Sequence, residues 1–230
     1  LARVDHVTGG RLGLFILANV IRGHRRGADY SFSCGLSCEQ ATSRRAGDCH
    51  THQQNDLDQD RLRAALHDTV EICKRLASVI ENAGDTVEIE NLKDGPTLED
   101  RNFDKIVIGA SIRYGKHRPQ VTDLINNHQA TLESKPSALF SVNVVARKPE
   151  KNTPETNPYL QKYLKQIDWQ PRHLAVFAGK IDYPRYSFLD RLAIRFIMWM
   201  TKGPTDPTAV VEFTDWNKVD EFANLVDEMR

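Results

Sequence analysis

The 230-residue sequence lacks any run of about 18 to 20 uncharged apolar residues, so no segment is expected to cross a bilayer by itself. It also lacks an excess of either charge, because 31 Lys and Arg residues balance 31 Asp and Glu residues. The overall charge therefore gives no indication of nucleic-acid binding, and an electrostatic partner has to be recognised by a local patch. No GxGxxG, Walker A or Ser-His-Asp pattern occurs, which removes the common dinucleotide, nucleotide and hydrolase signatures.

Cysteine is scarce as well, and its four residues are unevenly placed. Cys34, Cys38 and Cys49 lie in the first 50 residues, whereas Cys73 alone lies in the remainder. This is not the disulfide framework of a small secreted domain, and it favours a reducing compartment. The cysteines and histidines between residues 34 and 52 match no common zinc-finger spacing, so no metal site is predicted.

The first 60 residues differ in composition from the rest. Residues 23–60 have almost no apolar spacing, which predicts a mobile segment because too little surface can be buried to offset the ordering entropy. Residues 12–18 (LGLFILA) are the exception and have the length and composition of a strand. Residues 1–47 contain seven arginines and three acidic residues; a transit peptide is Arg-rich in this way, although the acidic residues weaken that interpretation.

From residue 61 onward, helical and strand-like patterns alternate. Residues 105–110 (KIVIGA) and 138–144 (ALFSVNV) are almost continuously apolar, as expected for a parallel sheet covered on both faces. Strands separated by helices predict right-handed crossovers and a doubly wound α/β fold. We expect helices over residues 61–83, 121–132, 159–166 and 216–229, and strands over residues 86–90, 105–110, 138–144, 174–178 and 210–213.

Ligands of a doubly wound sheet bind beyond the carboxyl ends of its strands, which points to the loops after Ala110, Val144 and Ala178. Residues 111–119 combine a hydroxyl side chain, an aromatic side chain and a glycine, which suit a flat ring system. A solvated polar loop explains the same composition. The basic residues at positions 147, 148 and 151 suit a carboxylate or phosphate partner, or are simply solvated.

The segment after Ala178 predicts an amphipathic helix that starts near Ser187. A cationic stripe opposite an apolar stripe with aromatic side chains fits a helix that lies in a membrane surface. Packing of that helix on its own domain is the commoner outcome and stays open. The cationic stripe consists of Arg191, Arg195 and Lys202, and the apolar stripe includes Phe188, Leu192, Phe196 and Trp199.

Four runs within residues 69–229 are more specific than these general patterns. They read IVIGASIRYGKH, SVNVVARKPEKNTPETNPY, AGKIDYPRYSFLDRLAIRFIMWM and VVEFTDWNKVDEFA. In this order they resemble the menaquinone-dependent protoporphyrinogen IX dehydrogenases, which are FMN enzymes of haem synthesis in bacteria and some protists. The ARKPEK and YPRY runs are the most distinctive parts of the resemblance.

The resemblance implies a flavodoxin-like, doubly wound parallel sheet of five strands with helices on both faces. It implies a domain over residues 61–230, in which an insertion at 179–209 interrupts the last strand, and an atypical segment before it. The activity implied is FMN-dependent oxidation of protoporphyrinogen IX to protoporphyrin IX, with electrons passed to menaquinone or ubiquinone. The implied location is the membrane surface, on the cytoplasmic face of an inner membrane or in a mitochondrion. A homo-oligomer is compatible with it.

Site residues follow from the resemblance and from charge. No general base is assigned. The implied cofactor-binding residues are Thr69, Ser111, Ile112, Arg113, Tyr114, Gly115, His117, Ser141, Asn143, Val144, Val145, Ala146 and Arg147. The electrostatic candidates for the substrate propionates are Arg147, Lys148 and Arg185, and the expected membrane contacts are Arg191, Arg195, Phe196 and Trp199.

One departure from the family pattern is large. The family begins with a buried strand and a Ser/Thr/Gly-rich loop that ends in Gly-Gln-Thr and holds the FMN phosphate at a helix N-terminus. Residues 61–69 read RLRAALHDT here, and only Thr69 fits. Either residues 12–18 supply the first strand through an unusually long connection, or the sheet lacks its central strand. A flavodoxin-type electron carrier, a quinone reductase and a relic with impaired flavin binding therefore stay as alternatives.

Overall fold

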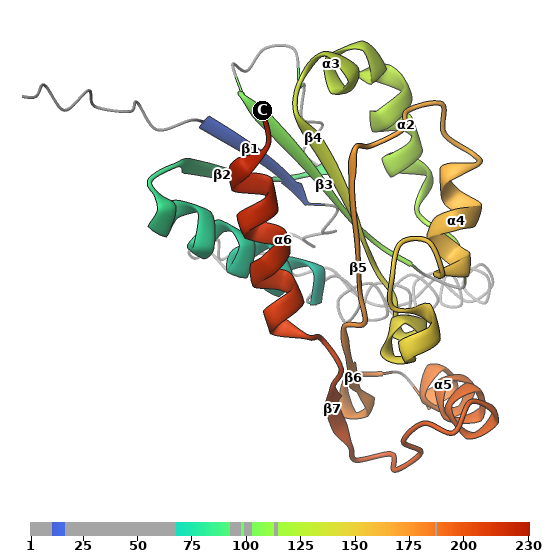
Figure 1. Cartoon of the computed structure of the whole chain (residues 1–230). Helices are drawn as coiled ribbons and strands as arrows, with labels where there is room; N and C mark the ends of the chain where they lie inside the picture. Colours follow the sequence, from blue (N-terminus) through green and yellow to red (C-terminus); the bar gives the residue numbers. More distant parts are fainter. Residues whose placement is uncertain (1–10, 17–67, 93–97, 99–102, 113–114, 187) are drawn as a thin grey trace, which may run out of the picture.

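The computed structural model describes residues 11–16, 68–92, 98, 103–112, 115–186 and 188–230 (Figure 1). Its main sheet is parallel and has the strand order β2-β1-β3-β4-β5, which is the order of flavodoxin-like sheets. The predicted doubly wound fold is thereby confirmed. The five strands are β1 (Arg11–Ile16), β2 (Thr86–Asn91), β3 (Lys105–Ser111), β4 (Ser137–Val142) and β5 (His173–Phe177).

Strand β1 answers the question that the sequence left open. It lies between two neighbours, with Leu14 beside Ile89 of β2 on one side and beside Val107 of β3 on the other. The sheet therefore has a central strand, and this strand comes from the apolar stretch predicted at 12–18. Residues 17–67, which connect β1 to the first helix of the domain, lie outside the described residues.

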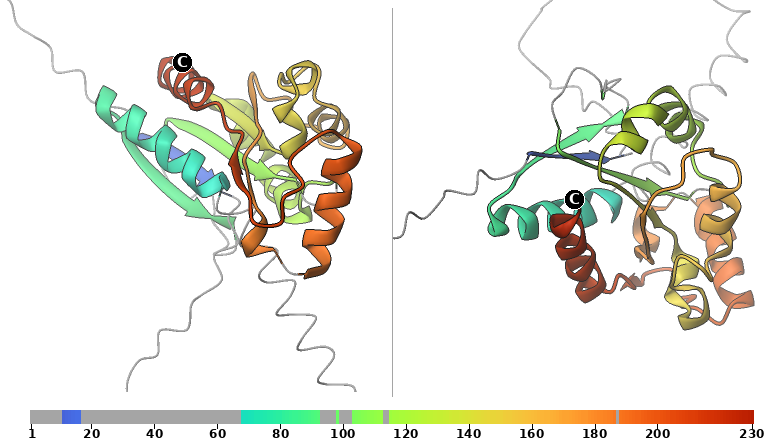
Figure 2. Two further views of the ribbon diagram at one scale, coloured as in Figure 1. Left: turned by 90° about the horizontal axis from the view of Figure 1, so that it is seen from below. Right: turned by 45° about the horizontal axis from the view of Figure 1, so that its top comes forward.

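Helices cover both faces of the sheet (Figures 1 and 2). On one face, the helix of residues 68–83 and α6 (Trp216–Glu228) pack on Val107, Phe140 and Phe177. On the other face, α2 (Pro119–Asn127) and α4 (Pro158–Leu164) pack on Ile106, Ile108 and Leu139. The predicted helix over residues 121–132 is two helices, because the chain leaves helical geometry at His128 before α3 (Gln129–Ser134).

Close packing explains a glycine in the middle of β3. A Cβ atom on Gly109 would lie 2.3 Å from Cζ of Phe140, its register partner on β4. Such a distance is far inside van der Waals contact, so a larger residue would displace the ring. Gly109 thus lets Phe140 lie flat over its neighbour and contact the rings of Phe177 and Phe222.

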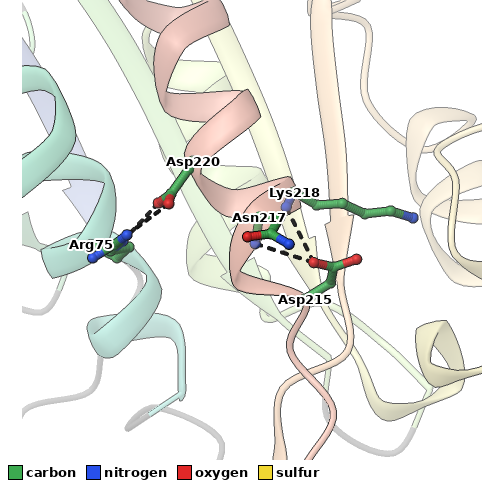
Figure 3. A network of polar contacts seen from close by, with 5 residues as sticks. All are labelled: Arg75, Asp215, Asn217, Lys218 and Asp220. Carbon is green, nitrogen blue, oxygen red and sulfur yellow. Dashed lines mark hydrogen bonds and ion pairs between the residues drawn. The ribbon is translucent and has the colours of Figure 1, made fainter.

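Polar contacts fix α6 at its outer face and at its start (Figure 3). Arg75 donates through Nε and Nη2 to the two carboxylate oxygens of Asp220, each over 2.7 Å. The Asp215 carboxylate accepts from the backbone N–H groups of Asn217 and Lys218 and caps the helix. A shallow open groove beside this pair is lined by Lys74 and Trp216 among others.

The segment after β5 forms a separate small unit. Strands β6 (Lys180–Asp182) and β7 (Val210–Glu212) pair antiparallel in a two-stranded sheet, with α5 (Phe188–Met200) between them in sequence. The expectation that residues 210–213 complete the last strand of the main sheet is therefore not met, because β7 pairs with β6 instead. Short 3-10 helices follow β4, at Val144–Arg147 and Pro149–Lys151, and β6, at Tyr183–Arg185. Among the described residues, no helix is long and apolar enough to cross a membrane.

Candidate functional site

Three loops meet at the carboxyl edge of the sheet, as the sequence predicted. The Ile112 N–H donates to the carbonyl of Val142 over 2.9 Å, and the Asn143 N–H donates to the carbonyl of Phe177 over 2.9 Å. These two bonds extend the parallel pairing past the ends of β3, β4 and β5. The rim of the site is therefore built on backbone that the sheet holds in register.

The predicted cofactor-binding residues fall into two groups by exposure. Side chains on the accessible part of the rim are half-buried and mainly apolar, whereas the others are buried beneath it. The half-buried group is Ile112, Gly115, His117, Val144, Val145 and Arg147, and the buried group is Thr69, Ser111, Ser141, Asn143 and Ala146. Arg113 and Tyr114 lie outside the described residues.

The accessible part of the rim suits a flat, largely apolar ring. Its described side chains carry no carboxylate, and Gly115 has a φ of +75°, which other residues rarely adopt. A Cβ atom on Gly115 would also lie 3.2 Å from the ring of Tyr159. The site therefore combines a tight glycine turn with a surface that excludes water, as a ring system requires.

His117 is the imidazole side chain of this rim. Its Nε2 lies 3.0 Å from Oγ of Ser141, and its ring stacks on Tyr163 with the centroids 4.1 Å apart. Burial lowers the pKa of His117 to about 4, because desolvation disfavours the charged imidazolium. The ring is consequently neutral near pH 7.

Two of the three predicted propionate ligands bond within the protein. Arg147 donates through Nη2 to Oγ1 of Thr201 over 2.7 Å and through Nη1 to the carbonyl of Val144 over 3.1 Å. Arg185 forms an ion pair with Asp182 over 3.1 Å. Lys148 is half-buried and forms no ion pair with any other described residue. Arg147 thus ties the loop after β4 to the end of α5.

The arginines of α5 face the protein and its apolar side chains face outward. Arg191 donates to the carbonyls of Tyr183 and Tyr186, and Arg195 donates to the carbonyl of Thr205 over 2.7 Å. These bonds hold α5 against its own insertion. We call the opposite surface the apolar face of α5; its side chains are between 47 and 77% exposed, and they are Phe188, Leu189, Leu192, Phe196, Ile197, Trp199 and Met200.

Sequence reasoning missed one half-buried carboxyl group at this edge, that of Asp68. Oδ2 of Asp68 accepts from the Lys180 N–H over 2.8 Å, and a Cβ atom on Gly179 would lie 2.9 Å from the same oxygen. Burial raises the pKa of Asp68 to about 7, and the negative charges of Glu212 and Asp182 add to this effect. Its partner lies 112 positions away in the chain, so no local pattern marks Asp68 as part of the edge.

Comparisons with known proteins give a consistent picture. A family model described as "Flavodoxin domain" matches residues 68–208, a range that holds the described rim and α5. The "Protoporphyrinogen IX dehydrogenase [quinone]" of Escherichia coli K12 is 44% identical over 158 residues, which is 69% of this chain and 87% of that protein. A Leishmania major protein of the same name is 43% identical over 153 residues, 66% of this chain and 65% of that one.

Likenesses to solved structures are looser. Flavodoxin 1 from Bacillus cereus superposes with a TM-score of 0.37 at 13% identity, over 94% of this chain and 95% of that one. Rubredoxin oxygen:oxidoreductase from Desulfovibrio gigas superposes with a TM-score of 0.38 at 12% identity, over 70% of this chain and 32% of that one.

Proposed function

The chain belongs to the family of quinone-dependent protoporphyrinogen IX dehydrogenases with a flavodoxin domain, and we infer that it oxidises protoporphyrinogen IX to protoporphyrin IX through bound FMN, with a quinone as electron acceptor. The observation that carries this function is the 44% identity over 87% of a dehydrogenase of that name. The sheet edge supports it, because the described rim lies at the carboxyl ends of the strands and its half-buried side chains are mainly apolar.

The described residues have separable roles in holding such a cofactor. When bound, the flavin supplies the two-electron redox chemistry. Ile112, Val144 and Val145 offer half-buried apolar surface that excludes water from the ring, and His117 offers a neutral imidazole. Buried residues such as Ser141 and Asn143 support these loops from beneath. The residues that would hold the phosphate are not among those described, apart from Thr69.

A basic group near the rim suits the substrate's carboxylates. Lys148 follows the 3-10 helix that carries Val144 and Val145, and its ammonium group has no ion-pair partner among the described residues. We therefore assign Lys148 as the principal propionate contact. The guanidinium groups of Arg147 and Arg185 already bond to Thr201 and Asp182, so a propionate would have to compete with these partners. We therefore assign these two arginines to holding the loops of the site in place.

The apolar face of α5 is proposed to contact the membrane that dissolves the quinone. Seven large apolar side chains on one helix form a larger exposed patch than soluble proteins normally leave uncovered. The helix also packs on Val144 of the rim through Met198 and its neighbours, so a bilayer in contact with α5 would lie close to the cofactor site. This assignment places Phe196 and Trp199 in the lipid surface and gives Arg191 and Arg195 the role of tethers.

Two measurements on the purified chain test the activity. Added FMN should lose its fluorescence on binding, and protoporphyrinogen IX with a quinone should then give porphyrin fluorescence that depends on both. A simple electron carrier or quinone reductase would bind FMN and pass electrons without oxidising porphyrinogen. Absence of FMN binding would instead identify the relic and refute the proposed function.

Vesicle binding tests the role of α5. We expect the full chain to bind uncharged phosphatidylcholine vesicles with little dependence on salt, because apolar contact does not depend on ionic screening. Phe196→Ser combined with Trp199→Ser should abolish most of this binding. A matched control, Ile89→Ser with Leu225→Ser, removes exposed apolar side chains elsewhere and should bind as the unmodified chain does. Equal binding by both double variants would refute the α5 contact.

A further inference from the structure

Beneath the rim, four polar side chains form one hydrogen-bonded chain that starts at the N-cap of α4. Oδ1 of Asn157 accepts from the backbone N–H groups of Tyr159 and Leu160, over 3.2 and 3.1 Å. A backbone N–H can only donate, so the amide oxygen of Asn157 has to face the helix. Its Nδ2 therefore faces the other way, where it donates to Oδ1 of Asn143 over 3.1 Å and to the carbonyl of Lys151 over 2.9 Å.

The orientation of Asn157 then fixes which group donates and which accepts in the next hydrogen bonds. Because Oδ1 of Asn143 accepts from Asn157, its Nδ2 points at Oγ of Ser141, 3.5 Å away. The hydroxyl of Ser141 accepts there and has one proton of its own to donate. Its other described partner is Nε2 of His117, 3.0 Å away. Because Ser141 is buried and no other described acceptor is bonded to its hydroxyl, the geometry favours this ring nitrogen as the acceptor of its proton. A neutral imidazole that accepts at Nε2 carries its proton on Nδ1.

The surroundings of His117 agree with a fixed, neutral ring. Tyr163 stacks against it, and the Tyr163 hydroxyl is itself bonded to Oγ1 of Thr122 over 3.3 Å. Burial is the sole cause of its lowered pKa, since no described charged group contributes. No described residue forms a hydrogen bond with Nδ1, so none of them competes with a ligand for its N–H.

We propose that His117 presents a neutral Nδ1–H donor to a hydrogen-bond acceptor of the ring ligand, and that Ser141 and the cap of α4 hold it in this tautomer. The acceptor class is a carbonyl oxygen or ring nitrogen, and the identification of that ligand as a flavin rests on the proposed function. Ser141 is fully buried and acts through His117 as a positioning residue, without touching the ligand.

The tautomer is measured without any ligand. In the full chain labelled with ¹⁵N-histidine, the two ring-nitrogen shifts of His117 should show Nδ1–H and a bare Nε2 around neutral pH. Ser141→Ala removes the donor to Nε2 and should populate the Nε2–H tautomer. The control Ser137→Ala removes a buried hydroxyl from the same strand, one that donates to Leu132, and should leave His117 unchanged. An Nε2–H ring in the unmodified chain, or an unchanged tautomer in Ser141→Ala, overturns the proposal.

The role toward the ligand is measured by FMN titration. The amide nitrogen of Asn at position 117 can take the place of Nδ1, whereas that of Gln reaches the place of Nε2. We expect His117→Gln to weaken FMN binding about tenfold and His117→Asn to weaken it less, in keeping with one lost hydrogen bond. Equal affinity in all three proteins overturns the donor role. If the unmodified chain binds no FMN, the proposed function fails, while the tautomer measurement still stands on its own.

Discussion

Two titratable side chains near the sheet edge are shifted in opposite directions by the same cause. Burial raises the pKa of Asp68 to about 7 and lowers that of His117 to about 4, and both shifts favour the uncharged form. The edge therefore carries less charge near neutral pH than its sequence indicates. Neither shift follows from local sequence, because burial is produced by residues from other parts of the chain.

Stability should fall with rising pH because of Asp68. Its folded pKa of about 7 lies above its ordinary value of 3.8, so the contribution is fully present below pH 3.8 and is lost as the pH rises through 7. Asp68→Asn cannot ionise, and its amide oxygen can still accept from the Lys180 N–H. We expect this variant to remove a slope of up to about 1.4 kcal/mol per pH unit in that window.

Urea unfolding of both proteins at several pH values measures this difference. The exposed Asp168→Asn serves as the control and should keep the pH dependence of the unmodified chain. If Asp68→Asn keeps it too, Asp68 does not titrate in this window.

Helix α5 shows that a sequence pattern predicts an amphipathic helix but not which of its faces is buried. The spacing of Arg191, Arg195 and the apolar side chains predicted α5 and its two faces. The spacing could not tell which face packs on the domain. A helix that buries its apolar face and a helix that exposes it have the same sequence pattern. The carbonyls of Tyr183, Tyr186 and Thr205 decide this by accepting from the arginines, which leaves the apolar face outside.

Arg147 is expected to control how firmly α5 is held. Arg147→Met removes the two hydrogen bonds from the guanidinium to Thr201, which directly follows α5. We predict several-fold faster proteolytic cleavage within α5, with the main domain still folded. Lys148→Met, one residue further along the same loop, should cleave like the unmodified chain. Equal cleavage rates for the two variants would show that Arg147 is not the tether.

The whole molecule depends on β1 because this strand lies in the middle of the sheet. Leu14→Pro removes a backbone donor from a strand that pairs on both sides, and a buried carbonyl left without its donor costs about 1 to 3 kcal/mol. Glu88→Pro on β2 affects a strand that pairs with β1 alone among the described strands, so it should cost less. Circular dichroism melts compare the two, and a larger loss for Glu88→Pro would contradict the central position of β1.

The sequence by itself determined the parallel α/β fold and the edge at which its loops meet. A continuous apolar run such as KIVIGA has to be buried on both faces. A parallel sheet with helices on both sides is the common fold that does this. The assignment of rim residues to a cofactor came from the resemblance and stays a prediction. Element ends were less well predicted, as the break at His128 and the missed strand β6 show.

Only the tertiary structure decided which strand lies in the centre, which face of α5 is exposed and what lies beneath the rim. The first and the last depend on partners from different parts of the chain, β1 with β3 and Ser141 with His117. The face of α5 depends on which carbonyls of the folded insertion its arginines reach. Periodicity records how one segment is patterned and cannot record what packs against it. The same reason explains why the sequence could not show that Ser141, predicted as a cofactor contact, is buried and lies 3.0 Å from Nε2 of His117.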